Sequence, residues 1–317
     1  MGDQVVVEIL DDQGILEIQC HGGRAAPLAV MHTLIQAGAA RAEPGLVAAT
    51  TAQSVIATQA LEDLPLAATL KTAAILLDQA DGALDREIAA IARLVVADRE
   101  ALVGRLKTLI QRSGIGLRLA RGWTVALAGR PNVGKSRLMN AIIGRERALV
   151  DHRPGTTRDV VTCELALEGW PIELVDTAGE REAIDSIERQ GIERARTARA
   201  HADLVLLVLD GSMPLEPSDF HLLSQPHQAR IVVANKSDLP PAWSLDQVGV
   251  ELAISAERGQ GLGELARLIA ERIVGDPPPA FAAVPFRGSH VQCIVDALDR
   301  VESGNPAEAL ARLARGG

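Results

Sequence analysis

The stretch that decides the fold is WTVALAGRPNVGKSRLMNAII, residues 123–143. It begins with an apolar run, passes through a loop with two glycines and ends in a segment of helical periodicity, which predicts a buried strand, a turn and a helix. Residues 129–136 fit the pattern G-x-x-x-x-G-K-[ST], in which small residues let backbone N–H groups converge on phosphate oxygens at the start of a helix. A glycine turn before an ordinary helix is the alternative, and the flanking strand and helix disfavour it. The stretch predicts a nucleotide site in an α/β domain.

The chemistry of this phosphate loop predicts which of its residues meet the nucleotide. Lys135 supplies a positive charge for the β- and γ-phosphates, and the Ser136 hydroxyl is a ligand for Mg²⁺. The predicted nucleotide-binding residues of the loop and the helix start are Asn132, Val133, Gly134, Lys135, Ser136 and Arg137.

Two later stretches have the features of switch segments. The polar run PGTTRD, residues 154–159, suits a loop that closes on the γ-phosphate, with Thr157 completing the Mg²⁺ shell. Predicted strands at residues 160–167 and 172–175 then deliver DTAG, residues 176–179, at the carboxyl end of a strand, where open α/β sheets place ligand-binding groups. Asp176 is expected on the metal or beside its ligands, and the Gly179 N–H at the γ-phosphate. The predicted nucleotide contacts here are Thr156, Thr157, Asp176, Thr177, Ala178 and Gly179.

The tetrapeptide NKSD, residues 235–238, predicts the base. The Asp238 carboxylate accepts hydrogen bonds from guanine N1 and N2, whereas adenine has no N1–H and would leave the carboxylate unpaired at a cost. The predicted contacts of the base are Asn235, Lys236, Asp238, Ser255 and Ala256. Five motifs in this order, each after an apolar strand, predict a P-loop GTPase domain with a mostly parallel sheet and helices on both faces.

The composition of the whole chain excludes several classes of protein. Its 317 residues are 47% hydrophobic, which is ample for a large core. The net charge of −9 argues against a broad basic surface, so any nucleic-acid contact is local or comes through a partner. Three widely spaced cysteines make neither a disulfide framework nor a zinc pattern, and no apolar run is long enough to span a membrane. These features predict a cytoplasmic protein with no membrane partner.

The rest of the chain predicts a short β unit followed by helices. Residues 5–19 alternate around a DDQG turn, which indicates a β-hairpin, and residues 27–39 have a helical pattern. Residues 46–113 are rich in Ala and Leu at helical spacing and predict two or three helices, with breaks near residues 64–65 and 81–82. Whether these helices serve as a scaffold or as a dimer surface stays open.

The segments GRPNVGKSRLMNAIIGRERALV, PGTTRDV, DTAGEREAIDSIERQGIERA and NKSD, with ILEIQCHGG and ARAEPG upstream, resemble the MnmE/TrmE family of tRNA uridine-modification GTPases over nearly the whole chain. The resemblance implies a G domain inserted into a helical domain, after a short N-terminal β-hairpin remnant. The expected domains are the hairpin and helix at 1–45, the first helical part at 46–120, the GTP-binding domain at 121–275, and a linker with the second helical part at 276–317. A helix at 286–314 is expected in the last of these.

The resemblance also implies site residues and partners. Asn132 matches an asparagine that helps to hold K⁺, and the backbone carbonyls of Asp151, Arg153 and Thr156 match the loop around that ion, which adds Asp151 to the nucleotide contacts. K⁺ there supplies charge where other GTPases use an arginine finger. Glu188 matches the glutamate that orients the attacking water through a bridging water. The implied function is K⁺-stimulated GTP hydrolysis in the modification of tRNA wobble uridine (position 34), with tRNA, an FAD-dependent MnmG-like subunit and a G-domain homodimer as partners.

The sequence departs from the family pattern at three places. The folate-binding part before the hairpin and the C-terminal Cys-x-Gly-Lys tail are missing, so we expect a truncated member without a folate site. Glu180 follows DTAG where an apolar residue is usual, and its charge repels the γ-phosphate unless it points outward. Two alternatives stay open: a GTPase of the same fold used in ribosome or RNP assembly or in regulation, and a GTP-binding module with little turnover. The five intact motifs argue against the second.

Overall fold

The computed structural model describes residues 6–10, 15–20, 25–40, 54–94, 98–145, 161–176, 202–226 and 229–305. The chain forms two compact units, Met1–Thr50 and Thr51–Gly317. In the first, β1 (Val6–Leu10) pairs antiparallel with β2 (Ile15–Gln19), and helix α1 (Ala25–Gln36) follows. The helix begins two residues before its predicted start, which leaves Pro27 in the first turn, where its missing N–H has no helical partner to lose.

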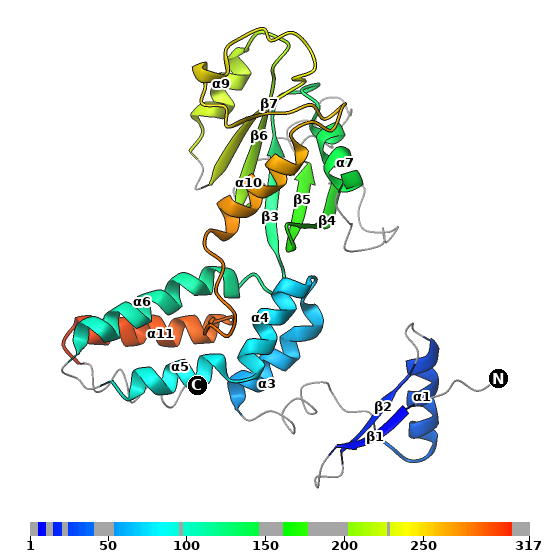
Figure 1. The fold of residues 1–317 in the computed structure, drawn as a ribbon, viewed down its shortest axis with the longest axis vertical. Coiled ribbons are helices and arrows are strands. Elements are labelled where there is room, and N and C mark those ends of the chain that lie inside the picture. Colours follow the sequence, from blue (N-terminus) through cyan, green and yellow to red (C-terminus); the bar gives the residue numbers. More distant parts are fainter. Residues whose placement is uncertain are drawn as a thin grey trace, which may run out of the picture. The chain divides into compact units, whose positions relative to one another are not determined.

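The second unit contains a six-stranded sheet in the order β4-β5-β3-β6-β7-β8 (Figure 1). The strands are β3 (Trp123–Ala128), β4 (Val161–Leu167), β5 (Trp170–Asp176), β6 (Leu204–Asp210), β7 (Arg230–Asn235) and β8 (Leu252–Ala253), with a 3₁₀ turn η2 (Leu245–Gln247) before β8. Only β4 is antiparallel to its neighbour. All seven residues of β6 are buried, as expected for a strand covered on both sides of a parallel sheet.

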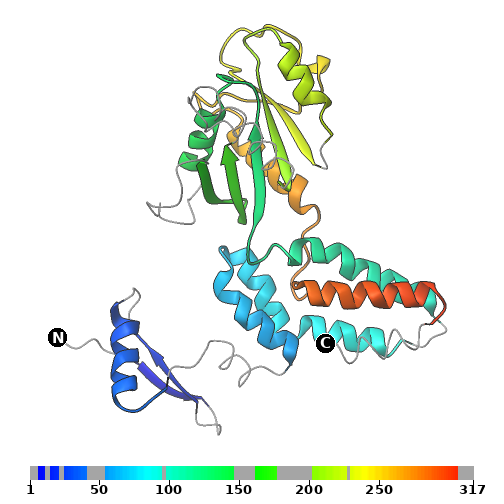
Figure 2. The same cartoon turned by 180° about the vertical axis from the view of Figure 1, so that it is seen from behind.

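Helices cover both faces of this sheet, because successive side chains of a strand point to opposite faces. Val125 and Leu127 of β3 belong to the core that includes α7 (Lys135–Arg145) and α10 (Leu262–Val274). Ala126 and Ala128 belong to a second core, on which α9 (Pro217–Ser224) packs. The predicted mostly parallel sheet with helices on both faces is confirmed, and Figure 2 shows it from behind.

A third core lies among helices α3 (Val55–Asp63), α4 (Leu70–Ala80), α5 (Ala83–Ala92), α6 (Arg99–Gly116) and α11 (Gly288–Glu302), with the 3₁₀ turn η1 (Leu64–Leu66) after α3. The chain runs from α6 into the sheet and returns from α10 to α11, which lies alongside α6 (Figures 1 and 2). No helix in the described part of the chain combines the length and the apolar character that crossing a membrane requires.

Two sequence predictions about helices are wrong. Within residues 46–113 the described segments contain four α-helices rather than two or three. The breaks predicted near residues 64–65 and 81–82 are present, at η1 and at Gly82, which has a φ of +83°. The additional helix is α6, which begins where the Asp98 side chain accepts the Ala101 N–H. Helix α11 ends at Glu302, well short of residue 314. Gly304 has a φ of +93° and donates to the Val301 carbonyl, while the Asn305 N–H donates to the Arg300 carbonyl. This is a Schellman motif, which stops a helix.

Candidate nucleotide site

The phosphate loop leaves β3 at its carboxyl end and enters α7, and three of its residues have left-handed backbone angles. Gly129 has a φ of +146°, Asn132 of +64° and Gly134 of +100°. A Cβ at Gly129 would lie 2.3 Å from the Val208 carbonyl oxygen, and one at Gly134 would lie 2.4 Å from the Asn235 amide nitrogen. Only glycine fits at these two positions, so the motif follows from the packing of the loop against β6 and β7.

Lys135, the first residue of α7, has its ammonium group inside the loop. Its side chain is buried, and Nζ donates to the carbonyl oxygens of Gly129 at 2.7 Å and Arg130 at 2.8 Å. Burial lowers the pKa of Lys135, and the nearby Asp176 carboxylate opposes this effect. The loop's own carbonyls therefore hold the positive charge at the position where a phosphate would be met.

Ser136 and Asp176 form the part of the site that suits a divalent cation. The Ser136 hydroxyl donates to Asp176 Oδ2 at 2.7 Å, and Asp176 is the buried last residue of β5. A hydroxyl and a carboxylate at this separation are the oxygen donors that Mg²⁺ takes while it keeps several waters and phosphate oxygens as its other ligands. The residues present therefore fit Mg²⁺.

Asn235, the last residue of β7, joins the phosphate loop to the loop after β8. Its Nδ2 donates to the Val133 carbonyl at 2.8 Å, and its Oδ1 accepts the Ala256 N–H at 3.0 Å. The side chain is 2% exposed, so both bonds lie in the interior. One amide thus fixes the spacing between the predicted phosphate-binding and base-binding segments.

Asp238 and Ser255 lie together on the base side of the site. The Ser255 hydroxyl donates to Asp238 Oδ1 at 2.5 Å, and Arg258 Nε lies 3.8 Å from Oδ2. The pKa of Asp238 is lowered, first by the hydrogen bond from Ser255, against an opposing effect of burial, and further by the charges of Arg258 and Lys236. The carboxylate therefore stays ionised and able to accept.

Asp210, which is not among the residues predicted from the sequence, holds Lys236. This buried carboxylate at the end of β6 accepts from Lys236 Nζ at 2.6 Å and from the Ser212 N–H and hydroxyl at 2.9 and 2.7 Å. Burial raises the pKa of Asp210, but the bonds from Lys236 and Ser212 outweigh it and lower the pKa. An acidic residue at a strand's carboxyl end, in register with Asn235, is the signal that could have identified it.

The structure brings together the predicted residues 132–136, 176, 235, 236, 238, 255 and 256 at the carboxyl ends of β3, β5, β7 and β8. Arg137 forms an exposed ion pair with Glu257 beside them. The other predicted residues lie outside the described segments, so their placement stays a prediction: Asp151, Arg153, Thr156, Thr157, Thr177, Ala178, Gly179 and Glu188.

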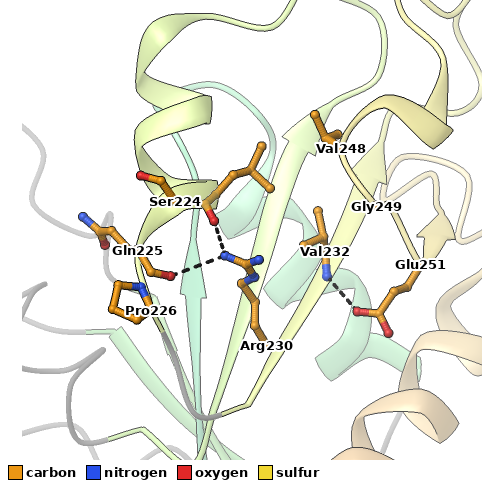
Figure 3. A pocket seen from close by; sticks show the side chains of 9 residues that line it. Ser224, Gln225, Pro226, Arg230, Val232, Val248, Gly249 and Glu251 are labelled. Atoms are coloured by element: carbon orange, nitrogen blue, oxygen red, sulfur yellow. Dashed lines mark hydrogen bonds between the residues drawn. The ribbon is translucent and has the colours of Figure 1, made fainter.

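A separate cavity of about 530 Å³ lies near the amino end of β7 (Figure 3). Its charged lining groups have partners within the protein: Arg230 Nη1 donates to the Leu223 carbonyl at 2.5 Å, and Glu251 Oε1 accepts the Val232 N–H at 3.3 Å. Because Arg230 is the first residue of β7 and Asn235 the last, this cavity lies at the opposite end of the strand from the nucleotide motifs.

Comparison with known proteins identifies the family. Residues 124–236 match a family model described as a 50S ribosome-binding GTPase. The tRNA modification GTPase MnmE of Lactococcus lactis subsp. cremoris (strain MG1363) is 34% identical over 354 residues, which cover 97% of this chain and 76% of that protein. MnmE of Synechococcus sp. (strain WH7803) is 35% identical over 91% of this chain and 71% of its own length. MnmE of Synechococcus sp. (strain CC9605) is 37% identical over 82% and 64%.

Two solved structures are also similar. Era of Aquifex aeolicus bound to GDP·AlF₄⁻ is 24% identical, with a TM-score of 0.38, over 56% of this chain and 65% of that one. The G domain of the T. maritima FeoB iron transporter is 30% identical, with a TM-score of 0.37, over 47% of this chain and 98% of that one.

The family model and the curated relatives are GTPases, and the matched residues contain the phosphate loop, the Ser136–Asp176 pair and the start of the base motif. The α/β part of the second unit is therefore a P-loop GTPase domain of a GTP-hydrolysing enzyme. Sequence identity above 30% across most of the chain, and across more than two thirds of two of these relatives, decides the family. The chain belongs to the MnmE family of tRNA modification GTPases.

Proposed function

We propose that the chain binds GTP between the phosphate loop and the loops after β7 and β8, and that it hydrolyses GTP with Mg²⁺ and K⁺ in the modification of tRNA wobble uridine. The observation that carries the proposal is the buried Asn235 amide, which bonds at once to Val133 of the phosphate loop and to Ala256 beside the base motif. A glycine turn before an ordinary helix needs no such link.

At the phosphate end of the site, a positive charge held in a fixed position would stabilise the phosphate groups. Lys135 is held by two carbonyls and offers its charge to the β- and γ-phosphates, where charge develops during phosphoryl transfer. Ser136 and Asp176 would hold Mg²⁺, which neutralises phosphate charge when bound. Asn132 has a left-handed backbone and an exposed side chain, which would help to hold K⁺.

The base end of the site selects guanine. Asp238 is kept ionised by the hydrogen bond from Ser255. Its carboxylate would accept hydrogen bonds from guanine N1 and N2, a pair of donors that adenine does not have. Lys236 is held by Asp210, and its aliphatic chain would cover one face of the base. Water orientation by Glu188 belongs to the same proposal, as do the domain boundaries at residues 45, 120 and 275.

The tRNA role rests on family membership. The relatives are named as tRNA modification GTPases, and we infer the same substrate class for this chain, with an FAD-dependent MnmG-like subunit and pairing of two G domains as the partners, in the cytoplasm. The net charge of −9 favours contact with tRNA through that partner rather than over a broad basic surface.

The deciding experiment is a strain that lacks the protein. Mass spectrometry of its tRNA is expected to show unmodified wobble uridine, restored by the wild-type gene but not by Lys135→Ala, which is produced at the same level and lacks the phosphate-binding charge. Normal wobble uridine together with accumulating ribosomal precursors would instead assign the chain to ribosome assembly.

A further inference from the structure

The second residue of the phosphate loop, Arg130, has its side chain directed to the start of helix α9. Its Nε lies 3.3 Å from Asp219 Oδ2, its Nη1 forms an ion pair with Glu216, and its Nη2 donates to the Pro214 carbonyl at 3.4 Å. The Arg130 side chain is 12% exposed and that of Asp219 is fully buried. The loop is therefore tied to a helix that lies outside all the nucleotide motifs.

Asp219 is a fixed anchor for this contact. Its Oδ2 also accepts the Glu216 N–H at 3.0 Å and so caps the first turn of α9. Within the described part of the chain, Arg130 Nε and Asp219 Oδ1 have no hydrogen-bond partner, so the contact between these two side chains is an ion pair rather than a hydrogen bond. Such a pair is a poor source of stability, because well-packed apolar residues of similar volume usually serve as well or better.

The backbone of Arg130 shows what the pair does instead. The Arg130 carbonyl is one of the two oxygens that hold the Lys135 ammonium. A shift of Arg130 would move this acceptor and, with it, the charge that meets the β-phosphate.

We propose that Arg130, Asp219 and Glu216 form a positioning cluster for the phosphate loop. Their contacts fix the position of the Arg130 carbonyl, and this carbonyl in turn fixes the position of the Lys135 ammonium group. The cluster deepens the proposed function, since it rests on the role of Lys135 in nucleotide binding. It adds three positioning residues: Arg130, at a position where the phosphate-loop pattern accepts any residue, and Asp219 and Glu216, which lie outside all the nucleotide motifs. A purely structural role, in which the pair only secures α9, is the competing account.

The test uses a variant that removes the charges without leaving one of them buried alone. Arg130→Met combined with Asp219→Asn keeps an amide oxygen to cap α9 and eliminates the ion pair. Arg272→Met is the control, because it removes an arginine from an ion pair, more exposed than that of Arg130, which Arg272 forms with Glu251 at 2.5 Å near the opposite end of the sheet. Thermal unfolding of each full-length variant monitors the fold.

Equilibrium competition against a fluorescent guanine nucleotide then separates the two accounts. GDP carries the β-phosphate that Lys135 meets, and GMP does not. We expect the double variant to raise the Kd for GDP by about 10-fold, by analogy with the low end of the loss seen when the hydrogen-bond partners of metal-ligating residues are removed. The Kd for GMP should stay nearly unchanged. The control changes neither.

Equal weakening of GDP and GMP, or no weakening of either, would overturn the positioning role. Wild-type protein that binds neither nucleotide would refute the proposed function itself, which is a different outcome. Glu216→Gln removes only the exposed arm of the cluster and is expected to give a smaller change in the same direction, in keeping with the low energy of exposed ion pairs.

Discussion

The substitution Asn235→Asp gives the most specific test of the site. It replaces the amide nitrogen Nδ2 by an oxygen and leaves the side-chain volume almost unchanged. The oxygen that accepts the Ala256 N–H is retained. The Nδ2 donor, 2.8 Å from the Val133 carbonyl oxygen, becomes a second acceptor that faces this carbonyl. The substitution therefore breaks one of two bonds and sets two oxygens against each other in the interior.

The loss of stability caused by Asn235→Asp can be estimated from this geometry. Leaving a buried carbonyl without its donor costs about 1–3 kcal/mol, and an ionised carboxylate at a site 2% exposed adds to that cost. We expect the free energy of unfolding to fall by about 2–3 kcal/mol at neutral pH. Since the same bond sets the spacing between the two halves of the site, a loss of about 2 kcal/mol in binding corresponds to a roughly 30-fold higher Kd for GDP.

The defect should depend on pH in a defined direction. A protonated carboxyl can donate to the Val133 carbonyl, so the folded state raises the pKa of the introduced group above its ordinary value of about 3.9. The stability regained through this hydrogen bond is fully present below the pKa of the group in the unfolded chain. It is lost as the pH rises through the pKa of the group in the folded protein. Relative to wild type, the variant is therefore expected to be less impaired at pH 5 than at pH 8.

Denaturant unfolding and fluorescent-GDP titration at both pH values measure these effects. Asn140→Asp is the control, because it introduces the same charge at an exposed position of α7. A deficit no larger than that of Asn140→Asp, or one that does not change between pH 5 and pH 8, would show that the Asn235 amide does not link the two loops.

Four further outcomes are expected. Asp238→Asn should shift preference from guanine to xanthine nucleotides in competition assays, because an amide can donate to the xanthine 2-oxo group; unchanged selectivity would remove Asp238 from the base site. GTP hydrolysis should be faster in KCl than in NaCl, and Asn132→Ala should abolish the difference; equal wild-type rates would exclude the K⁺ role. Glu188→Ala should lower kcat by about 100-fold with GTP affinity nearly unchanged, whereas Glu180→Ala should not lower it; the reverse ranking would move the water-orienting role to Glu180. Burial, aided by Arg287, lowers the pKa of His290 from its ordinary value to about 4, so the stabilising effect of the neutral ring is complete above about pH 6.5 and is lost as pH falls toward 4; wild-type unfolding free energy should decrease over that window, and a His290→Gln variant that declined equally would contradict this.

The nucleotide motifs could be predicted from sequence because their chemistry is local. A phosphate loop needs its glycines, lysine and serine at fixed spacing on one continuous turn, so the sequence pattern by itself predicts the geometry of the loop. The clash that a Cβ at Gly134 would make with Asn235 shows the physical origin of one position in the pattern. The apolar runs before each motif likewise identified the parallel strands, since such strands are buried on both sides.

The supporting residues could not be predicted in the same way. Asp210 and Lys236 are 26 residues apart, and Arg130 and Asp219 belong to segments with no common motif, so only the packed structure shows that they meet. The end of α11 is different, because Gly304 with Asn305 after it is a helix stop that the sequence contained. The helix that the family resemblance implies at 286–314 runs past this stop.

These supporting contacts change how nucleotide affinity should be understood. Lys135 is bonded to two loop carbonyls, Ser136 to Asp176, and Asp238 to Ser255. The net affinity for a nucleotide therefore depends on how these partners hold the binding groups as well as on the contacts that the groups make with the ligand. Because Lys135 and Asp238 are held in place by their partners, these two side chains add little ordering cost to binding. Substitutions at the supporting partners should then weaken binding without touching the ligand, which is why Asn235 and the Arg130 cluster are the informative places to perturb this site.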